Sequence, residues 1–135
     1  MGDQMPYRAI TRGIEVSVEP AFVAQQAVPG EQRFVWAYRV RIDNQGPETV
    51  QLRSRHWRIT DARGALNEFR GEGVVGQQPV LKPGDAFQYS SWVPLHTPSG
   101  IMMGTYQMEA GNKEVFDIEI PVFLLDSPGQ TTQYN

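Results

Sequence analysis

The segment Phe34-Val35-Trp36-Ala37-Tyr38-Arg39-Val40-Arg41-Ile42 places a large apolar side chain at every even position and both of its arginines at odd positions. This period of two is that of a β-strand with one face in a hydrophobic core and the other in water. The same alternation occurs at residues 14–18 and, near the other end of the chain, at residues 116–122. The three segments predict an all-β protein.

Weaker strand signals fill the intervals between these three segments. Apolar and β-branched residues cluster in four further stretches, at 50–60, 66–71, 87–93 and 102–109. Thirteen glycines and ten prolines punctuate the chain at short intervals, and no window carries a helical stripe. About seven short strands joined by turns predict an antiparallel two-sheet sandwich of the fibronectin type III or immunoglobulin-like kind.

One domain accounts for the chain, because 135 residues match the usual size of a domain and no repeat or linker divides them. The two ends are polar and unpatterned. We therefore expect a single domain over 8–125 and flexible tails at 1–7 and 126–135. Most aromatic side chains fall on inward phases, where a core is expected: Trp36, Tyr38, Trp57, Tyr89, Trp92 and Tyr106.

Composition excludes several classes of function. Cysteine is absent, which excludes disulfides and thiolate chemistry. His56 and His96 lack metal-ligand spacing, and no nucleophile, base and acid converge, so we expect no metal site, no cofactor and no catalytic residues. No apolar run of about 18 residues and no signal sequence is present, which predicts a cytoplasmic protein without membrane insertion. A net charge of −3 gives no reason to expect nucleic acid as a partner.

The glycine-rich segment Gly71-Glu72-Gly73-Val74-Val75-Gly76 matches the pattern GxGxxG. In a dinucleotide-binding fold these glycines precede a helix whose N-terminus holds the phosphate. Here Pro79 and Pro83 follow, and two prolines so close together cannot open a helix. We expect a loop that uses its glycines for positive φ or close crossing. An anion on the backbone amides at Gly71, Gly73 and Gly76 is the alternative.

The stretch at 50–60 changes its phase. Its apolar residues occupy even positions up to Leu52 and odd positions from Trp57 onward. One extra unpaired residue repairs such a shift, so a β-bulge is predicted between Arg53 and His56.

Arginine is concentrated in the middle of the chain, where eight arginines stand against four acids between Arg33 and Arg70. If the strands on either side of Asn44-Gln45-Gly46-Pro47 form a hairpin, four arginines share its outer face and two of them lie directly opposite each other. Like charges in that position destabilise a sheet, so acids from a third strand or an anionic partner should compensate. The candidate partner-binding residues are Arg39, Arg41, Arg53, Arg55 and His56.

Several segments resemble the bacterial ApaG family, also called CorD. They include Arg55-His56-Trp57-Arg58-Ile59-Thr60-Asp61, the glycine segment, and Thr97-Pro98-Ser99-Gly100-Ile101 with the residues that follow. The resemblance implies a fibronectin type III-like sandwich in a bacterial protein linked to cobalt resistance and magnesium efflux. Similar domains in eukaryotic F-box proteins and in a polymerase-interacting protein look like protein-binding modules. The family's glycine motif has suggested pyrophosphate binding.

These observations favour a binding module over an enzyme. We expect a non-catalytic domain that contacts a protein partner. The alternative is a domain that binds phosphate or a nucleotide on the glycine segment.

Overall fold

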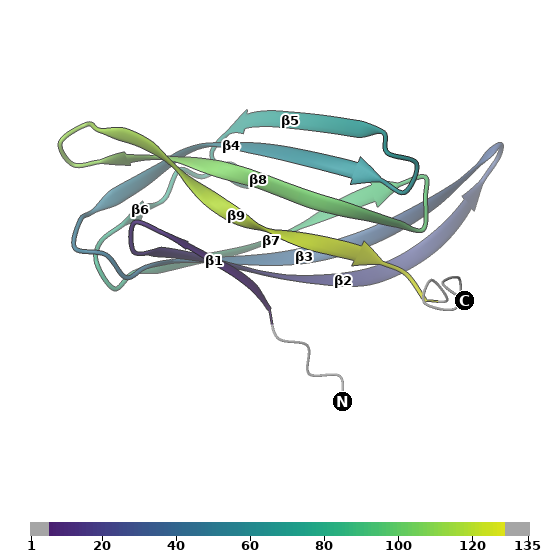
Figure 1. Cartoon of the computed structure of the whole chain (residues 1–135), viewed down its shortest axis with the longest axis horizontal. Helices are drawn as coiled ribbons and strands as arrows, with labels where there is room; N and C mark the ends of the chain where they lie inside the picture. The colour runs from purple at the N-terminus through teal and green to yellow at the C-terminus, as the bar shows by residue number, and fades with distance from the viewer. Residues whose placement is uncertain (1–5, 129–135) are drawn as a thin grey trace.

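The computed structural model describes residues 6–128, which form two antiparallel sheets packed face to face without any helix (Figure 1). The predicted fold class is therefore confirmed. The strands of this part of the chain are β1 (Tyr7–Thr11), β2 (Ile14–Val28), β3 (Glu31–Asn44), β4 (Val50–Asp61), β5 (Leu66–Glu72), β6 (Val80–Leu81), β7 (Ala86–Leu95), β8 (Ser99–Ala110) and β9 (Val115–Asp126).

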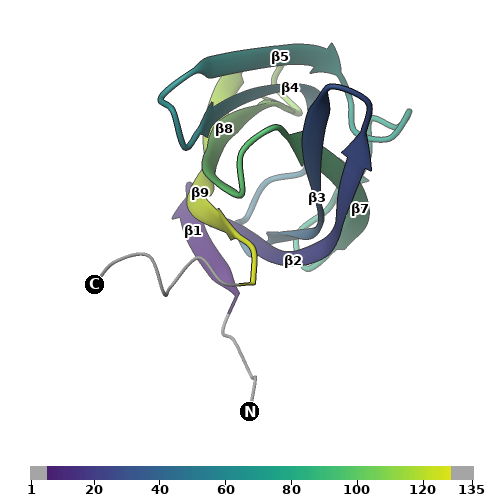
Figure 2. The same cartoon turned by 90° about the vertical axis from the view of Figure 1, so that its right-hand side faces the viewer.

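The two sheets meet on one side of the sandwich and leave the other side open. One sheet has the order β1-β2-β3-β7, and the other has the order β5-β4-β8-β9 with the short β6 paired to β4. Strands β1 and β2 contact β9, so this side is closed (Figure 2). On the opposite side, β5 and β7 are edge strands that each pair with one neighbour.

The inward phases found in the sequence form the core. The even-numbered residues of β3 from Phe34 to Ile42 are all buried, as the alternation predicts. Trp57 of β4 packs edge-on against Tyr38 and Phe123, with ring centroids 5.4 and 6.0 Å away. Such contacts between buried aromatic rings stabilise a core beyond the area they bury. Trp92 is the exception among the predicted core aromatics, since it is 62% exposed.

A β-bulge in β4 lies at the start of the predicted interval. Leu52 pairs with Met108 of β8 and Ser54 pairs with Gln107, so Arg53 is the extra residue. The bulge returns Trp57 to the core. It also places Arg55 on the same inward face of β4 as Trp57.

The predicted hairpin between β3 and β4 is wrong. Strand β3 pairs with β2 and β7, whereas β4 belongs to the other sheet. The connection after Asn44 crosses between the sheets, because the buried Asn44 side chain fixes the corner. Its Nδ2 donates to the carbonyls of Glu48 (2.7 Å) and Leu81 (2.9 Å), and its Oδ1 accepts from the Gly46 amide.

The sandwich extends slightly beyond the predicted boundaries of 8 and 125. Tyr7 belongs to β1 and packs on Phe123 with ring centroids 6.1 Å apart. Asp126 ends β9, and the Ser127 hydroxyl donates to the Pro98 carbonyl at 2.7 Å. The predicted tails are therefore too long by these residues. Their remaining parts at 1–5 and 129–135 lie outside the described residues.

Candidate functional site

The predicted arginine face does not form, because its members lie on different sheets. Arg39 and Arg41 project from β3, where Arg39 pairs with Glu19 of β2. Arg53 lies at the bulge of the other sheet, with Nε 3.5 Å from the Glu109 carboxylate. The prediction that Arg39 lies directly opposite Arg53 depended on the hairpin between β3 and β4, and it is wrong for the same reason.

Arg55 and His56 point to opposite faces of their sheet, as neighbours in a strand do. His56 Nε2 lies 2.7 Å from Oε1 of Glu68 on the outer face. This contact lowers the pKa of the exposed Glu68 carboxyl below its ordinary value. Arg55 shares the inner face with Tyr106, its partner on β8, and with Trp57. Of the five predicted site residues, Arg55 alone enters the space between the sheets.

A glycine at position 71 makes room for the Arg55 guanidinium. Gly71 pairs with Arg55 across β4 and β5, and a Cβ there would lie 2.9 Å from Nη1. Nη1 donates to the main-chain carbonyls of Glu72 at 3.1 Å and Gly73 at 2.7 Å. The guanidinium is thus held flat against β5 at the start of the glycine segment.

The rest of the glycine segment is the positive-φ loop that the sequence predicts. Gly73 and Gly76 have φ of 62° and 80°. The Gly73 amide donates to the Arg53 carbonyl, and Val74 and Gln77 exchange two backbone hydrogen bonds. The next element is the short strand β6, not a helix. The amides of Gly73, Val74 and Gln77 therefore have partners within the chain.

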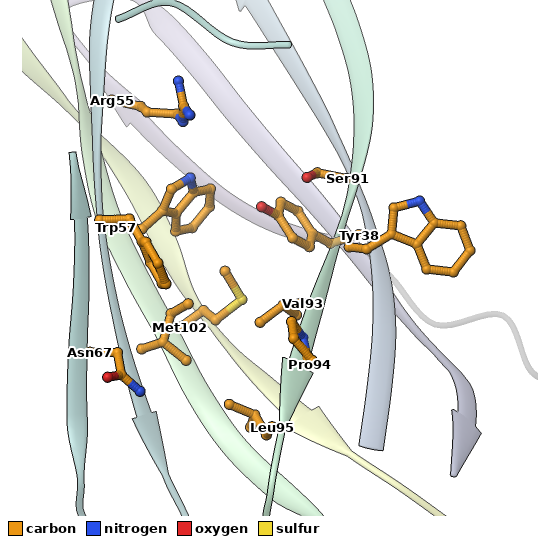
Figure 3. A pocket seen from close by; sticks show the side chains of 12 residues that line it. Tyr38, Arg55, Trp57, Asn67, Ser91, Val93, Pro94, Leu95 and Met102 are labelled. Atoms are coloured by element: carbon orange, nitrogen blue, oxygen red, sulfur yellow. The ribbon is translucent and has the colours of Figure 1, made fainter. Parts of the chain in front are cut away.

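A groove of about 310 Å³ opens between the edge strands β5 and β7 (Figure 3). Its walls come from five strands, and they form a mainly apolar surface with Arg55 at one end and Asn67 and Leu95 towards the other. Phe69 of β5 stands over this surface and is 55% exposed. The apolar residues of the lining are Trp57, Ile59, Phe69, Trp92, Val93, Pro94, Leu95 and Met102.

Neutral hydroxyls surround the Arg55 end of the groove. Tyr38 and Ser91 face Arg55 across the opening (Figure 3). Behind them, the hydroxyls of Tyr89 and Tyr106 share a hydrogen bond. Burial raises the pKa of Tyr38, Tyr89 and Tyr106, which keeps all three phenols uncharged at neutral pH. None of them supplies a negative charge to the guanidinium.

The described part of the chain offers neither a metal-binding cluster nor a membrane-spanning helix. Residues 6–128 contain no group of three His, Cys, Asp or Glu side chains that could hold a metal ion. No helix in the same range is long and apolar enough to cross a membrane.

Comparisons with known proteins establish the family. A model described as the ApaG domain matches residues 24–110. Protein ApaG of Rhodospirillum centenum is 59% identical over 122 residues, which make up 90% of this chain and 94% of that protein. The chain belongs to the ApaG family. Protein ApaG of Brucella anthropi is 57% identical over 129 residues, or 96% of this chain and 99% of the relative.

A solved ApaG-like structure agrees with the fold. The crystal structure of the putative ApaA protein from Bordetella pertussis is 48% identical to this chain and superposes with a TM-score of 0.80. The match covers 86% of this chain and 94% of the other. The family resemblance predicted from the sequence segments is therefore confirmed.

Sequence reasoning missed the groove, although one signal for it was available. After the bulge, Arg55 has the same odd phase as Trp57 and Ile59, which places it inside the sandwich. The predicted hairpin instead placed Arg55 on the outer face of a sheet. The order of strands in the two sheets puts β5 and β7 on either side of one opening. Alternation along single strands does not reveal that order.

Proposed function

We propose that this ApaG-family chain is a non-catalytic binding module that holds a protein partner in the groove between β5 and β7. The observation that carries the proposal is the open side of the sandwich, where Phe69 stands exposed over an apolar surface. Exposed apolar surface beside a groove is typical of interaction sites. We place this activity in the cytoplasm, and we propose that the link to cobalt resistance and magnesium efflux implied by the family resemblance acts through the partner.

The two edge strands supply a second means of attachment. Within residues 6–128, β5 pairs with β4 alone and β7 pairs with β3 alone, so each leaves one edge without a strand partner there. An edge strand presents backbone donors and acceptors that can pair with an added strand. Such main-chain hydrogen bonds give affinity, and the groove gives side-chain selectivity.

The proposal is tested by substituting two exposed apolar side chains, one at the groove and one away from it. Phe69→Ser removes the exposed ring over the groove, whereas Val122→Ser removes an apolar side chain of similar exposure on β9, which does not line the groove. The tagged full chain and both variants are crosslinked in native bacterial lysate, and the captured proteins are identified by mass spectrometry. We expect one set of proteins to be retained by Val122→Ser and lost by Phe69→Ser.

Both substitutions are at exposed positions, so neither should change the free energy of unfolding by more than about 1 kcal/mol. Thermal melts of the three proteins control for this. Identical captured sets from all three proteins would remove the groove as the binding site.

A further inference from the structure

We infer that the groove selects an extended polypeptide segment that places a carboxylate on Arg55 and large apolar side chains along the surface beside it. This inference rests on the proposed function and adds the chemistry of the partner. It also gives the spacing of the recognised residues.

Arg55 places a positive charge at one end of the groove. Both hydrogen bonds that hold the Arg55 guanidinium use Nη1 and end on main-chain carbonyls, which carry no net charge. Arg55 takes part in none of the ion pairs among residues 6–128, although Arg53 and His56 beside it each have an acidic partner. A half-buried guanidinium without a carboxylate is complementary to an acidic ligand, and its planar fork of donors suits a carboxylate best.

The surroundings of the Arg55 guanidinium are mostly apolar or neutral. Arg55 is the only charged side chain among the residues that line the groove, and the nearby Tyr38, Tyr89 and Tyr106 are neutral, so few charges screen the guanidinium. An ion pair formed there is stronger than one on the open surface. The remaining Arg39 and Arg41 lie on the outer face of the other sheet and cannot substitute for Arg55.

The register between β4 and β5 fixes the spacing of the recognised residues. Across β4 and β5, Arg55 pairs with Gly71, Trp57 with Phe69, and Ile59 with Asn67. These three levels are successive inward positions, about 6.6 Å apart along a strand. Consider a ligand strand paired with the free edge of β5, and call the ligand residue beside Gly71 and Arg55 residue i. The ligand residue two positions from i then lies beside Phe69, and the one four positions from i lies beside Asn67. The predicted motif is an acid followed or preceded by apolar residues at every second position.

The test begins with selection of random dodecapeptides, displayed on phage, by the immobilised full chain. We expect enriched sequences to carry Asp or Glu with large apolar residues two and four positions away. Synthetic fluorescein-labelled copies of an enriched peptide are then measured by anisotropy, each beside a copy in which the acid is replaced by its amide. On the unaltered chain the amide copy should bind at least about tenfold more weakly, because the guanidinium then loses its counter-charge.

Two arginine variants locate the effect. On Arg55→Gln, acid and amide peptides should bind within about twofold of each other. On Arg53→Gln, which removes the same charge from the bulge, the tenfold preference for the acid should persist. Since the preference is first measured on the unaltered chain, a destabilised Arg55→Gln does not prevent the test. Amide shifts in ¹H–¹⁵N spectra of the unaltered chain should move on β5 and β7 when the peptide is added.

Other outcomes would overturn the inference, and some of them would also count against the proposed function. Enriched peptides that bind the β5–β7 edge without preferring an acid overturn the inference and leave the proposed function standing. Failure to enrich any peptide, or binding on another face, counts against both. Dimerisation that Arg55→Gln abolishes would make a second copy the occupant, and saturable binding of decanoate without peptide binding would make it a small carboxylate. Either outcome overturns the inference.

Discussion

At the scale of single residues, the family's glycine segment has two different tasks. Gly71 leaves space for a side chain, because a Cβ there would meet the Arg55 guanidinium. Gly73 serves the backbone, since it combines a φ of 62° with a close approach of the Gln77 carbonyl. The GxGxxG pattern identified the right residues in the sequence. Their roles follow from the neighbouring strand, which the pattern does not contain.

Gly73→Ala should be far more destabilising than Gly76→Ala. A Cβ at Gly73 would lie 2.3 Å from the Gln77 oxygen, whereas a Cβ at Gly76 would meet nothing within 4 Å. Both positions have positive φ, which costs an alanine about 1 kcal/mol. Gly76→Ala should therefore lose about this amount in urea unfolding, and Gly73→Ala at least about 2 kcal/mol more because backbone must move. Equal losses would show that the Gln77 contact is easily relieved.

The same proteins distinguish loop geometry from nucleotide binding. A ligand that binds the native state stabilises it by RT ln(1 + [L]/Kd) and so raises the melting temperature. Because the Gly73, Val74 and Gln77 amides already have partners, millimolar ATP or GTP should leave the melting temperature of the unaltered chain unchanged. A clear increase with GTP that Gly73→Ala abolishes would restore the nucleotide-binding alternative.

At the scale of elements, alternation predicted the strands but not the sheet to which each belongs. The inward phase of β3 continues to Asn44, a polar residue that is 1% exposed. A buried polar residue at the end of a strand is typical of a corner whose backbone it bonds. Short turns with Asn, Gly and Pro also occur in hairpins, so the sequence did not distinguish the two connections. Strand β1 was missed because Tyr7–Thr11 contains only five residues, and β6 contains only two.

Asn44→Ala should cost about 2–4 kcal/mol in urea unfolding. The substitution leaves the Leu81 carbonyl without the side-chain amide that bonds it at a buried position, and it removes the contacts to Glu48 and Gly46. Loss of a partner from a buried polar group costs about 1–3 kcal/mol, and more than one group is affected. Gln45→Ala is the matched control, because its side chain makes an exposed hydrogen bond to Glu15. The control should stay within about 0.5 kcal/mol of the unaltered chain.

At the scale of the whole molecule, the sandwich is stabilised unequally around its circumference. Strands β3, β4 and β8 are bonded on both sides, and the β1–β9 side is closed by packing. Strand β5 is bonded on one side and its residues are exposed apart from the partly covered Gly71. Apolar burial therefore contributes little to the stability of β5, as is typical of elements that bind a ligand.

Hydrogen exchange should therefore divide the sandwich into a stable centre and a labile open edge. Amides of β3 and β8 that pair within their sheets are expected to exchange only through global unfolding, because opening them disrupts the buried core. The bonded amides of β5 should open at lower free energy, by about 2 kcal/mol or more, since few apolar contacts hold that strand. Residue-resolved exchange by NMR at several low urea concentrations measures both classes. Adding a selected peptide should slow β5 and leave β8 unchanged, whereas uniform exchange across β5 and β8 would mean that the open edge is as firmly held as the core.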